Sequence, residues 1–259
     1  MNIDRVVLVW DGNPFYDGFY ERHCALWGKL GIKTGLVFVS DGKNIALKPS
    51  IGDVVVVEDK SKVPFTPPPG RNWKATMAII YGPTLFKDEV VMVTGMDQFP
   101  ASMRFINAVA KVPDTDLATC IGSKRHITTN HVVAHNRVWS RSMSAAPADF
   151  TDLLEWTWQR KMDLSGYAGI ATGWGSDEVL FAQLVQQCDW LTVQTIFKDY
   201  QTEWLDRVLG ITQKVPDPQK LKDGWYSELH IRLPMSQLDR NTFNTLLSLE
   251  PFPGMIEND

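Results

Sequence analysis

The sequence predicts an α/β domain with a mostly parallel central sheet. Short β-branched runs, such as residues 5–10, alternate with stretches of helical periodicity, and the links between them are short. Strand, helix and strand in this order are typical of the start of a parallel sheet. The 259 residues, 44% of them apolar, are enough for one large core, and no internal repeat or low-complexity tract divides them. We therefore expect a single domain spanning residues 1–259.

The first hundred residues carry the clearest pattern. Residues 5–10 predict a buried strand that ends in a turn of Asp, Gly, Asn and Pro. Apolar residues from Phe15 to Leu30 then recur at helical spacing, and Gly31 occupies the position of a helix-ending glycine. Further strands are expected at 34–40, 53–57 and 89–95, with a helix at 73–81.

The remaining residues predict shorter elements. Helices are expected at 102–111, 147–162, 176–187 and 236–249, and strands at 116–121, 131–135, 191–197 and 226–232.

Composition narrows the class of function. The formal net charge of −4 gives the chain no general attraction for nucleic acid, so no nucleic-acid partner is expected. Three widely spaced cysteines without a C-x-x-C pattern indicate reduced thiols. The amino-terminal residues lack the layout of a signal peptide, and no apolar run approaches 18 residues. We expect a cytoplasmic protein without a transmembrane segment.

Polar residues follow three of the predicted strands. Asp11 and Asn13 follow the first strand, Asp59 the third and Asp97 the run at 89–95. Ligands of open α/β sheets bind at the carboxyl ends of strands, although turns also favour Asp and Asn for conformational reasons. Asp97 is the strongest candidate, because it follows a run that is apolar on both faces. A carboxylate there is a natural ligand for a hard divalent cation that carries a diphosphate.

Two acids beside a tryptophan form a second candidate cluster, in the run Trp174-Gly175-Ser176-Asp177-Glu178. A helix start explains a capping Ser176 and one acid without any catalysis. The functional interpretation is that Asp177 or Glu178 binds or deprotonates a sugar hydroxyl while Trp174 stacks on the sugar ring. The sequence leaves both interpretations open.

A third cluster lies on the strand expected at 226–232. Strand periodicity places Glu228, His230 and Arg232 on one face. His230 could bind a metal and Arg232 a phosphate, or the three could form a cross-strand ladder of ion pairs.

Other motifs are absent or have the wrong geometry. The strand expected at 131–135 places His131 and His135 about 13 Å apart, too far for one zinc ion. The chain contains no G-x-x-x-x-G-K-[ST], G-x-G-x-x-G or G-x-S-x-G motif.

The order of these clusters resembles small bacterial and viral GT-A glycosyltransferases of the nucleotide-diphospho-sugar transferase superfamily. The resemblance is carried by the runs VVLVWDGNPFY, EVVMVTGMDQFP, WGSDE and ELHIRLP, which together span most of the chain. It implies a three-layer α/β/α sandwich in which residues 1–100 bind the nucleotide sugar and residues 101–259 bind the acceptor. It also implies a cytoplasmic location, that of the host cell if the protein is viral.

The resemblance implies a role for each cluster. Asp97 matches the last Asp of the DxD motif and, with His230, would bind Mn²⁺ or Mg²⁺ on the diphosphate. The donor nucleotide would contact Trp10, Asp11 and Asn13, and the phosphates would contact Arg71, Lys74 and Arg232. Asp177 and Glu178 would be the catalytic acids on the acceptor side, with Trp174 binding the acceptor.

Gly95 departs from the DxD pattern, because it occupies the place of the first Asp. Asp11 or Asp59 could substitute for that acid, or Arg71, Lys74 and Arg232 could hold the phosphates without a metal. The function expected is transfer of a sugar from a nucleotide-diphosphate sugar to an acceptor hydroxyl. The alternative is a degenerate relative that binds a nucleotide or glycan without turnover. A nucleotidyltransferase is disfavoured, because the turn DGNPFYDG has no basic residue.

Overall fold

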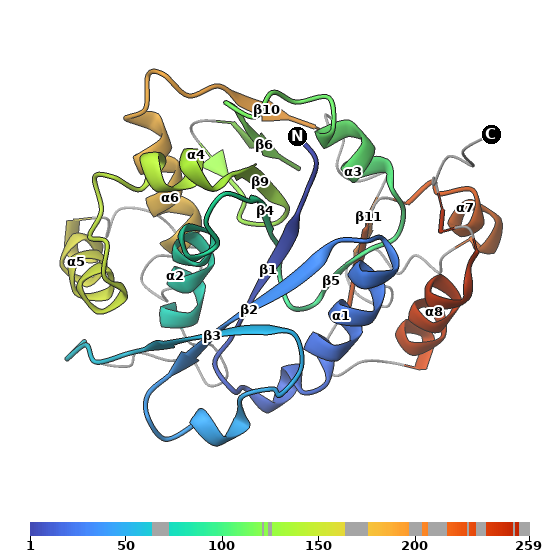
Figure 1. Ribbon diagram of the computed structural model, residues 1–259, viewed down its shortest axis with the longest axis horizontal. Helices are drawn as coiled ribbons and strands as arrows, with labels where there is room; N and C mark the ends of the chain where they lie inside the picture. The colour runs from blue at the N-terminus through green and yellow to red at the C-terminus, as the bar shows by residue number, and fades with distance from the viewer. Residues whose placement is uncertain are drawn as a thin grey trace.

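Seven strands form the central sheet of the computed structural model, in the order β10-β6-β9-β4-β1-β2-β3 (Figure 1). All of them run parallel except β9, which pairs antiparallel with both β4 and β6. The strands are β1 (Arg5–Trp10), β2 (Lys33–Ser40), β3 (Asp53–Glu58), β4 (Val90–Val93), β6 (Leu117–Thr119), β9 (Val132–His135) and β10 (Val193–Thr195). The predicted α/β class with a mostly parallel sheet is confirmed.

The structure describes residues 1–63, 73–120, 122–123, 126–163, 176–196, 204–206, 217–226, 228–231, 237–250 and 252–253. The α-helices in these ranges are α1 (Phe19–Lys29), α2 (Trp73–Tyr81), α3 (Arg104–Val109), α4 (Asn136–Ser142), α5 (Phe150–Asp163), α6 (Ser176–Gln186), α7 (Pro218–Lys222) and α8 (Gln237–Ser248). Short 3-10 helices are η1 (Pro14–Tyr16), η2 (Ile45–Leu47) and η3 (Gly82–Leu85).

Alternation along the strands creates two cores, one on each face of the sheet. Val6 and Leu8 of β1 point into a core shared with α1, α3 and α8, whereas Val7 points into a core shared with α2, α4, α5 and α6. Figure 1 shows these two groups of helices on opposite sides of the sheet. This arrangement is the three-layer sandwich that the sequence predicts, because a parallel sheet must have both faces covered.

The start of the chain illustrates how the sequence determines local structure. Gly31 adopts a φ of 71°, a left-handed conformation that favours glycine, and ends helix α1. The Ile32 amide donates to the carbonyl of Trp27, and the Gly31 amide donates to that of Gly28. These two bonds form the Schellman motif expected from a glycine at this position.

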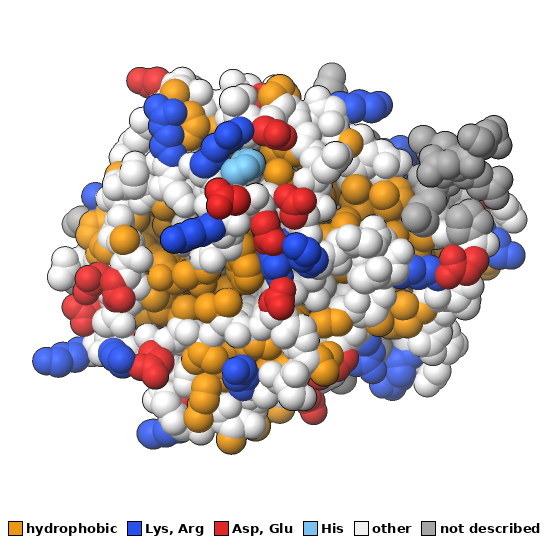
Figure 2. All heavy atoms as spheres, viewed as in Figure 1, with side chains coloured by type: hydrophobic (Ala, Val, Ile, Leu, Met, Phe, Trp, Pro, Cys, Tyr) orange, Lys and Arg blue, Asp and Glu red, His pale blue; other side chains and the backbone are white. Residues whose placement is uncertain are grey.

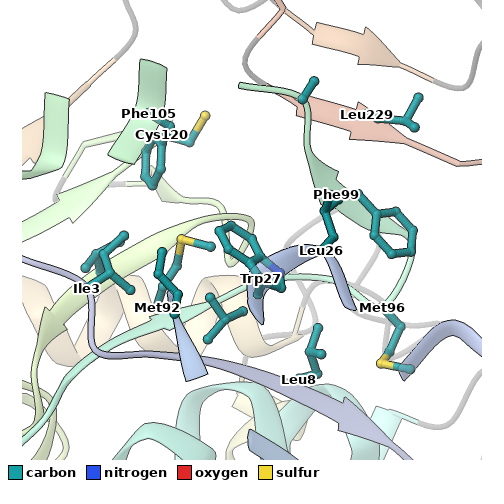
Figure 3. Close-up of a cluster of buried hydrophobic side chains, with 14 of the residues drawn as sticks. Ile3, Leu8, Leu26, Trp27, Met92, Met96, Phe99, Phe105, Cys120 and Leu229 are labelled. Carbon is teal, nitrogen blue, oxygen red and sulfur yellow. The ribbon is translucent and has the colours of Figure 1, made fainter. Parts of the chain in front are cut away.

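A small second sheet joins the tail of the chain to the turn that follows β4. Its strands lie in the order β11 (Trp204–Asp206), β12 (Glu228–His230) and β5 (Gln98–Pro100). Figure 3 shows Trp27 of α1 beside Met92 of the central sheet, and Phe99 on β5 next to the strand that carries Leu229. Phe99 and Leu229 are paired residues of β5 and β12. All four side chains are less than 2% exposed. Burial of each residue of this size contributes about 1.5–3 kcal/mol to the free energy of unfolding. These contacts therefore stabilise the packing of the small sheet against the central sheet and α1.

Several predicted elements differ from those observed. The strand expected at 89–95 ends at Val93, and the helix expected from Phe15 begins at Phe19 after η1. Strand β5 and helix α4 were not predicted. Strand β5 has three residues and is defined by its pairing with β12, about 130 residues away, so local periodicity does not reveal it. A two-stranded sheet of β7 (Gly122–Ser123) and β8 (His126–Ile127) was missed for the same reason.

Three global expectations can be compared with the structure. Cys24, Cys120 and Cys188 are free thiols, as predicted. In the part of the chain that the structure describes, no helix is long and apolar enough to cross a membrane. The central sheet takes β6, β9 and β10 from residues 101–259, so both predicted halves build it, while their assignment to donor and acceptor stays a prediction.

Candidate functional site

Asp97 and His230 meet although they lie 133 residues apart in the sequence. The His230 Nε2 atom lies 3.2 Å from Asp97 Oδ2. Strand pairing produces this approach, because His230 of β12 lies opposite Gln98 of β5 and the Ile231 amide donates to the Asp97 carbonyl at 2.7 Å. The His230 side chain is 11% exposed and the Asp97 side chain is 25% exposed, so the pair is partly shielded but accessible to a small ligand. The convergence expected of the two residues is thus present in the fold.

Gly95 is a close-approach glycine in the turn before Asp97. A Cβ atom at this position would lie 2.9 Å from Asp97 Oδ1 and 3.0 Å from Gln98 Oε1. Real Cβ atoms essentially never approach oxygen within 3.0 Å, so either the carboxylate or the amide would have to move. A side chain at position 95 would therefore crowd the Asp97 carboxylate and the Gln98 amide.

The Gln98 side chain stabilises this turn by accepting two hydrogen bonds from it. Its Oε1 accepts the Gly95 amide hydrogen at 2.9 Å and the Thr94 hydroxyl hydrogen at 3.2 Å. Gln98 is 2% exposed, so these bonds are not replaced by bonds to water. No sequence motif marks Gln98, and its only local signal is its place immediately after Asp97.

The turn after β1 is bonded mainly within itself. Asp11 Oδ1 accepts the Asn13 amide at 3.1 Å, and the Asn13 side chain caps η1 by accepting the Phe15 amide. The Trp10 indole donates to the Asn13 carbonyl at 2.9 Å and is mostly buried. These bonds match the conformational role of Asp and Asn in turns. Because β1 and β4 are parallel neighbours, this turn still lies at the same sheet edge as Asp97.

Lys74 lies at the start of α2 and is paired with Asp59, which follows β3. The Lys74 Nζ atom lies 2.6 Å from Asp59 Oδ2 and 3.2 Å from Ser61 Oγ, and both charged side chains are at most 10% exposed. Lys74 was expected to bind a phosphate, and Asp59 was considered as a metal ligand. Either interaction would have to break this ion pair.

Asp177 and Glu178 begin helix α6 and face the segment before β9. The Thr129 hydroxyl donates to Asp177 Oδ2 at 2.7 Å, and the Thr129 amide donates to Glu178 Oε1 at 3.3 Å. Asp177 is 3% exposed, and burial, with a smaller effect of the neighbouring Glu178 charge, raises its pKa to about 7. Burial likewise raises the pKa of Glu178.

The two acids lie near the same sheet edge as Asp97. Val132 pairs with Val93, and β9 is antiparallel to β4, so the residues before β9 adjoin those after β4. Thr129, which the sequence analysis did not identify, is the residue that binds both acids on that side.

Three predicted site residues, Arg71, Trp174 and Arg232, lie outside the described residues. The strand expected at 131–135 begins one residue later, so only His135 of the rejected zinc pair lies in it. His135 ends β9, and its Nδ1 accepts the Arg137 amide at the start of α4. His131 precedes β9, is buried and has a φ of 52°.

The donor atoms at Asp97 and His230 fit a divalent cation that also binds a diphosphate. A carboxylate and an imidazole suit Mn²⁺, and Mg²⁺ accepts the carboxylate more readily than the imidazole. Among the residues that the structure describes, no group of three or more His, Cys, Asp or Glu side chains could hold a metal ion. From the described residues a cation here would take Asp97 and His230, and phosphate oxygens and water could fill further positions.

The face shown in Figure 2 has, among its described residues, no large patch in which all charged side chains have the same sign. Basic and acidic side chains intermingle near the centre of that face, with hydrophobic side chains beside them. This mixture agrees with the small net charge of −4.

Comparison with known proteins reveals likeness at the level of structure. No protein-family model matches the sequence, and no curated protein matches it significantly. Among solved structures, the galactosyltransferase LgtC in complex with donor and acceptor sugar analogues has a TM-score of 0.53 and 12% identity, covering 95% of this chain and 97% of that one. An active-site mutant of LgtC has a TM-score of 0.51 and 11% identity, covering 96% and 98%.

The glycosyltransferase GlyE from Streptococcus pneumoniae also matches, with a TM-score of 0.47 and 13% identity. The match covers 95% of this chain and 60% of GlyE, so the chain spans less than two thirds of that protein. At these identities the LgtC matches establish a shared glycosyltransferase fold, in agreement with the GT-A-like architecture expected from the sequence.

Proposed function

We propose that this protein is a glycosyltransferase that moves a sugar from a nucleotide-diphosphate sugar to an acceptor hydroxyl, with Mn²⁺ or Mg²⁺ on the diphosphate. The single observation that carries the proposal is the approach of His230 to Asp97 at the end of β4. Two distant segments bring a carboxylate and an imidazole together at the sheet edge where ligands of this architecture bind. The fold shared with LgtC, whose structure was solved with donor and acceptor sugar analogues, supports the same proposal.

In the proposed reaction, the bond between the anomeric carbon and the diphosphate oxygen breaks, and the acceptor oxygen forms a new bond to that carbon. A cation on Asp97 and His230 would offset the negative charge that grows on the leaving diphosphate. Arg71 and Arg232 would add positive charge, and Lys74 would do so if it exchanged Asp59 for a phosphate. Contacts that strengthen as this charge develops accelerate the reaction, because they stabilise the transition state more than the substrate.

The acceptor hydroxyl must lose a proton during transfer. We propose that Glu178, which is less buried than Asp177, orients this hydroxyl or takes its proton. Asp177 would act through Thr129, to which both acids are bonded. Trp174 would stack on the acceptor ring, and Trp10, Asp11 and Asn13 would lie beside the nucleotide.

The test is release of free nucleotide from UDP-, GDP- and CDP-sugars, with and without Mn²⁺. We expect turnover with one of them, and Asp97→Ala should abolish its metal-dependent part. Asp189→Asn is the matched control, because this exposed acid follows the carboxyl end of α6, at the opposite end of that helix from Asp177 and Glu178. Unchanged kinetics in the Asp97 variant would show that the site is misplaced, and no turnover or thermal shift with any donor would remove the enzyme proposal.

A second candidate is a degenerate transferase that binds a nucleotide or glycan without turnover. It is favoured by Gly95, because a DxD motif supplies a further acid at that position, and the described residues bring together only Asp97 and His230. A thermal shift with a nucleotide sugar, in the absence of any released nucleotide, would single out this candidate.

A further inference from the structure

We propose that His23 of α1 is a positioning residue that fixes the turn carrying Asp97. This inference concerns a residue with no role in the proposed transfer reaction, and its link to metal binding rests on that proposed function. His23 is completely buried, so it cannot contact a substrate itself.

The protonation state of His23 follows from its two neighbours. The Trp27 indole Nε1 lies 3.2 Å from His23 Nδ1, and an indole N–H can only donate. His23 Nδ1 must therefore accept, which leaves the ring hydrogen on Nε2. That atom lies 3.0 Å from the Met96 carbonyl oxygen and donates to it. The neutral ring thus relays one hydrogen bond from α1 to the turn after β4.

Packing keeps the ring in this orientation. The His23 ring stacks on the Phe99 ring, with 4.1 Å between centroids and 15° between planes. Burial lowers the pKa of His23 to about 3, so the ring stays neutral at any pH at which the protein would work. Its two hydrogen bonds therefore do not change with pH in that range.

The bonded carbonyl lies next to the proposed metal ligand. Because a peptide group is planar, fixing the Met96 carbonyl also fixes the Asp97 amide and the direction of its Cα atom. On the other side, the Asp97 carbonyl accepts the Ile231 amide of the tail at 2.7 Å. Asp97 is thus held between α1 and the segment that carries His230.

Two substitutions of nearly equal polarity distinguish an effect of the hydrogen bond from His23 to the Met96 carbonyl from an effect of packing alone. In His23→Gln the amide extends far enough to donate to the Met96 carbonyl, whereas in His23→Asn it does not. We expect His23→Asn to weaken Mn²⁺ binding about tenfold to a hundredfold, the range found for partners of metal ligands, and His23→Gln to weaken it much less. Titration of Mn²⁺ alone, followed by the EPR signal of the free ion, measures this directly.

The stability control is Leu26→Ala, which opens a cavity in the same helix and core and removes neither hydrogen bond of His23. It should lower the melting temperature and leave Mn²⁺ affinity unchanged. Equal Mn²⁺ affinity in the wild type and His23→Asn, with Asp97→Ala losing it, would overturn the positioning role.

A second readout does not depend on the metal. If the wild type binds no Mn²⁺, the proposed metal site fails, and the relay is then judged by hydrogen exchange of the Ile231 amide. We expect faster exchange in His23→Asn than in His23→Gln or Leu26→Ala. Identical exchange in all three variants would overturn the inference by itself.

Discussion

Replacing Asp177 by Asn should make the protein more stable at alkaline pH and flatten the pH dependence of its stability. Asp177 is a buried carboxyl whose pKa is raised to about 7, mainly by burial. The unfolded chain releases this proton near pH 4, whereas the folded protein keeps it until about pH 7. Between these values the unfolded state binds fewer protons, so the free energy of unfolding falls as pH rises.

The size of the effect follows from the shift of about three pKa units. At about 1.4 kcal/mol per unit, full ionisation of Asp177 costs about 4 kcal/mol, of which about 2–3 kcal/mol falls between pH 5 and pH 8. An asparagine carries no charge, and its side-chain oxygen can still accept the Thr129 hydroxyl hydrogen that Asp177 accepts at 2.7 Å. The variant should therefore lose this part of the pH dependence while keeping the local bond.

The assay is urea unfolding at several values between pH 5 and pH 8, for the wild type and the variant. Glu178→Gln is the control, because Glu178 adjoins Asp177 but is less buried, and it should remove less of the slope. The same difference in stability between wild type and Asp177→Asn at every pH would contradict this prediction. It would mean that the fold does not favour the protonated form of Asp177.

The other predictions concern the turn at Gly95 and the pair at Lys74. Gly95→Asp should weaken Mn²⁺ binding and destabilise the fold by about 1–3 kcal/mol, because its Cβ would lie 2.9 Å from Asp97 Oδ1; tighter Mn²⁺ binding in an EPR titration would contradict the close-approach role. Lys74→Met should cost about 3–5 kcal/mol in urea unfolding, because it leaves Asp59 buried without its cation. Lys60→Met, which breaks an exposed pair, should leave the melting temperature unchanged, and equal losses in both variants would refute the importance of burial.

Much of the fold could be predicted from local pattern. The strands at 5–10 and 53–58 and the helix at 73–81 have nearly the predicted bounds, because each is a continuous run of one periodicity. The strand most important for the site, β5, and its pairing with β12 could not be predicted in the same way. Three residues are too few to show a period, and their conformation depends on a partner about 130 residues away.

The candidate site could be predicted in part. The residue types at Asp97 and His230 marked them as candidate metal ligands. The resemblance to GT-A glycosyltransferases implied that both would bind the same metal ion. The sequence could not reveal that Gln98 fills the space beside Gly95, or that Thr129 binds both acids of α6. Those contacts join residues with no shared local signal.

Local sequence patterns predict the α/β class, the mostly parallel sheet and the glycine that ends α1. These features follow from steric preferences and hydrophobic periodicity, which act over a few residues. Which polar residues are shielded, paired or neutral depends on long-range contacts, as it does for His23, Lys74 and Asp177. Charge and protonation depend on burial and on neighbours brought from distant parts of the chain, and no local pattern contains that information.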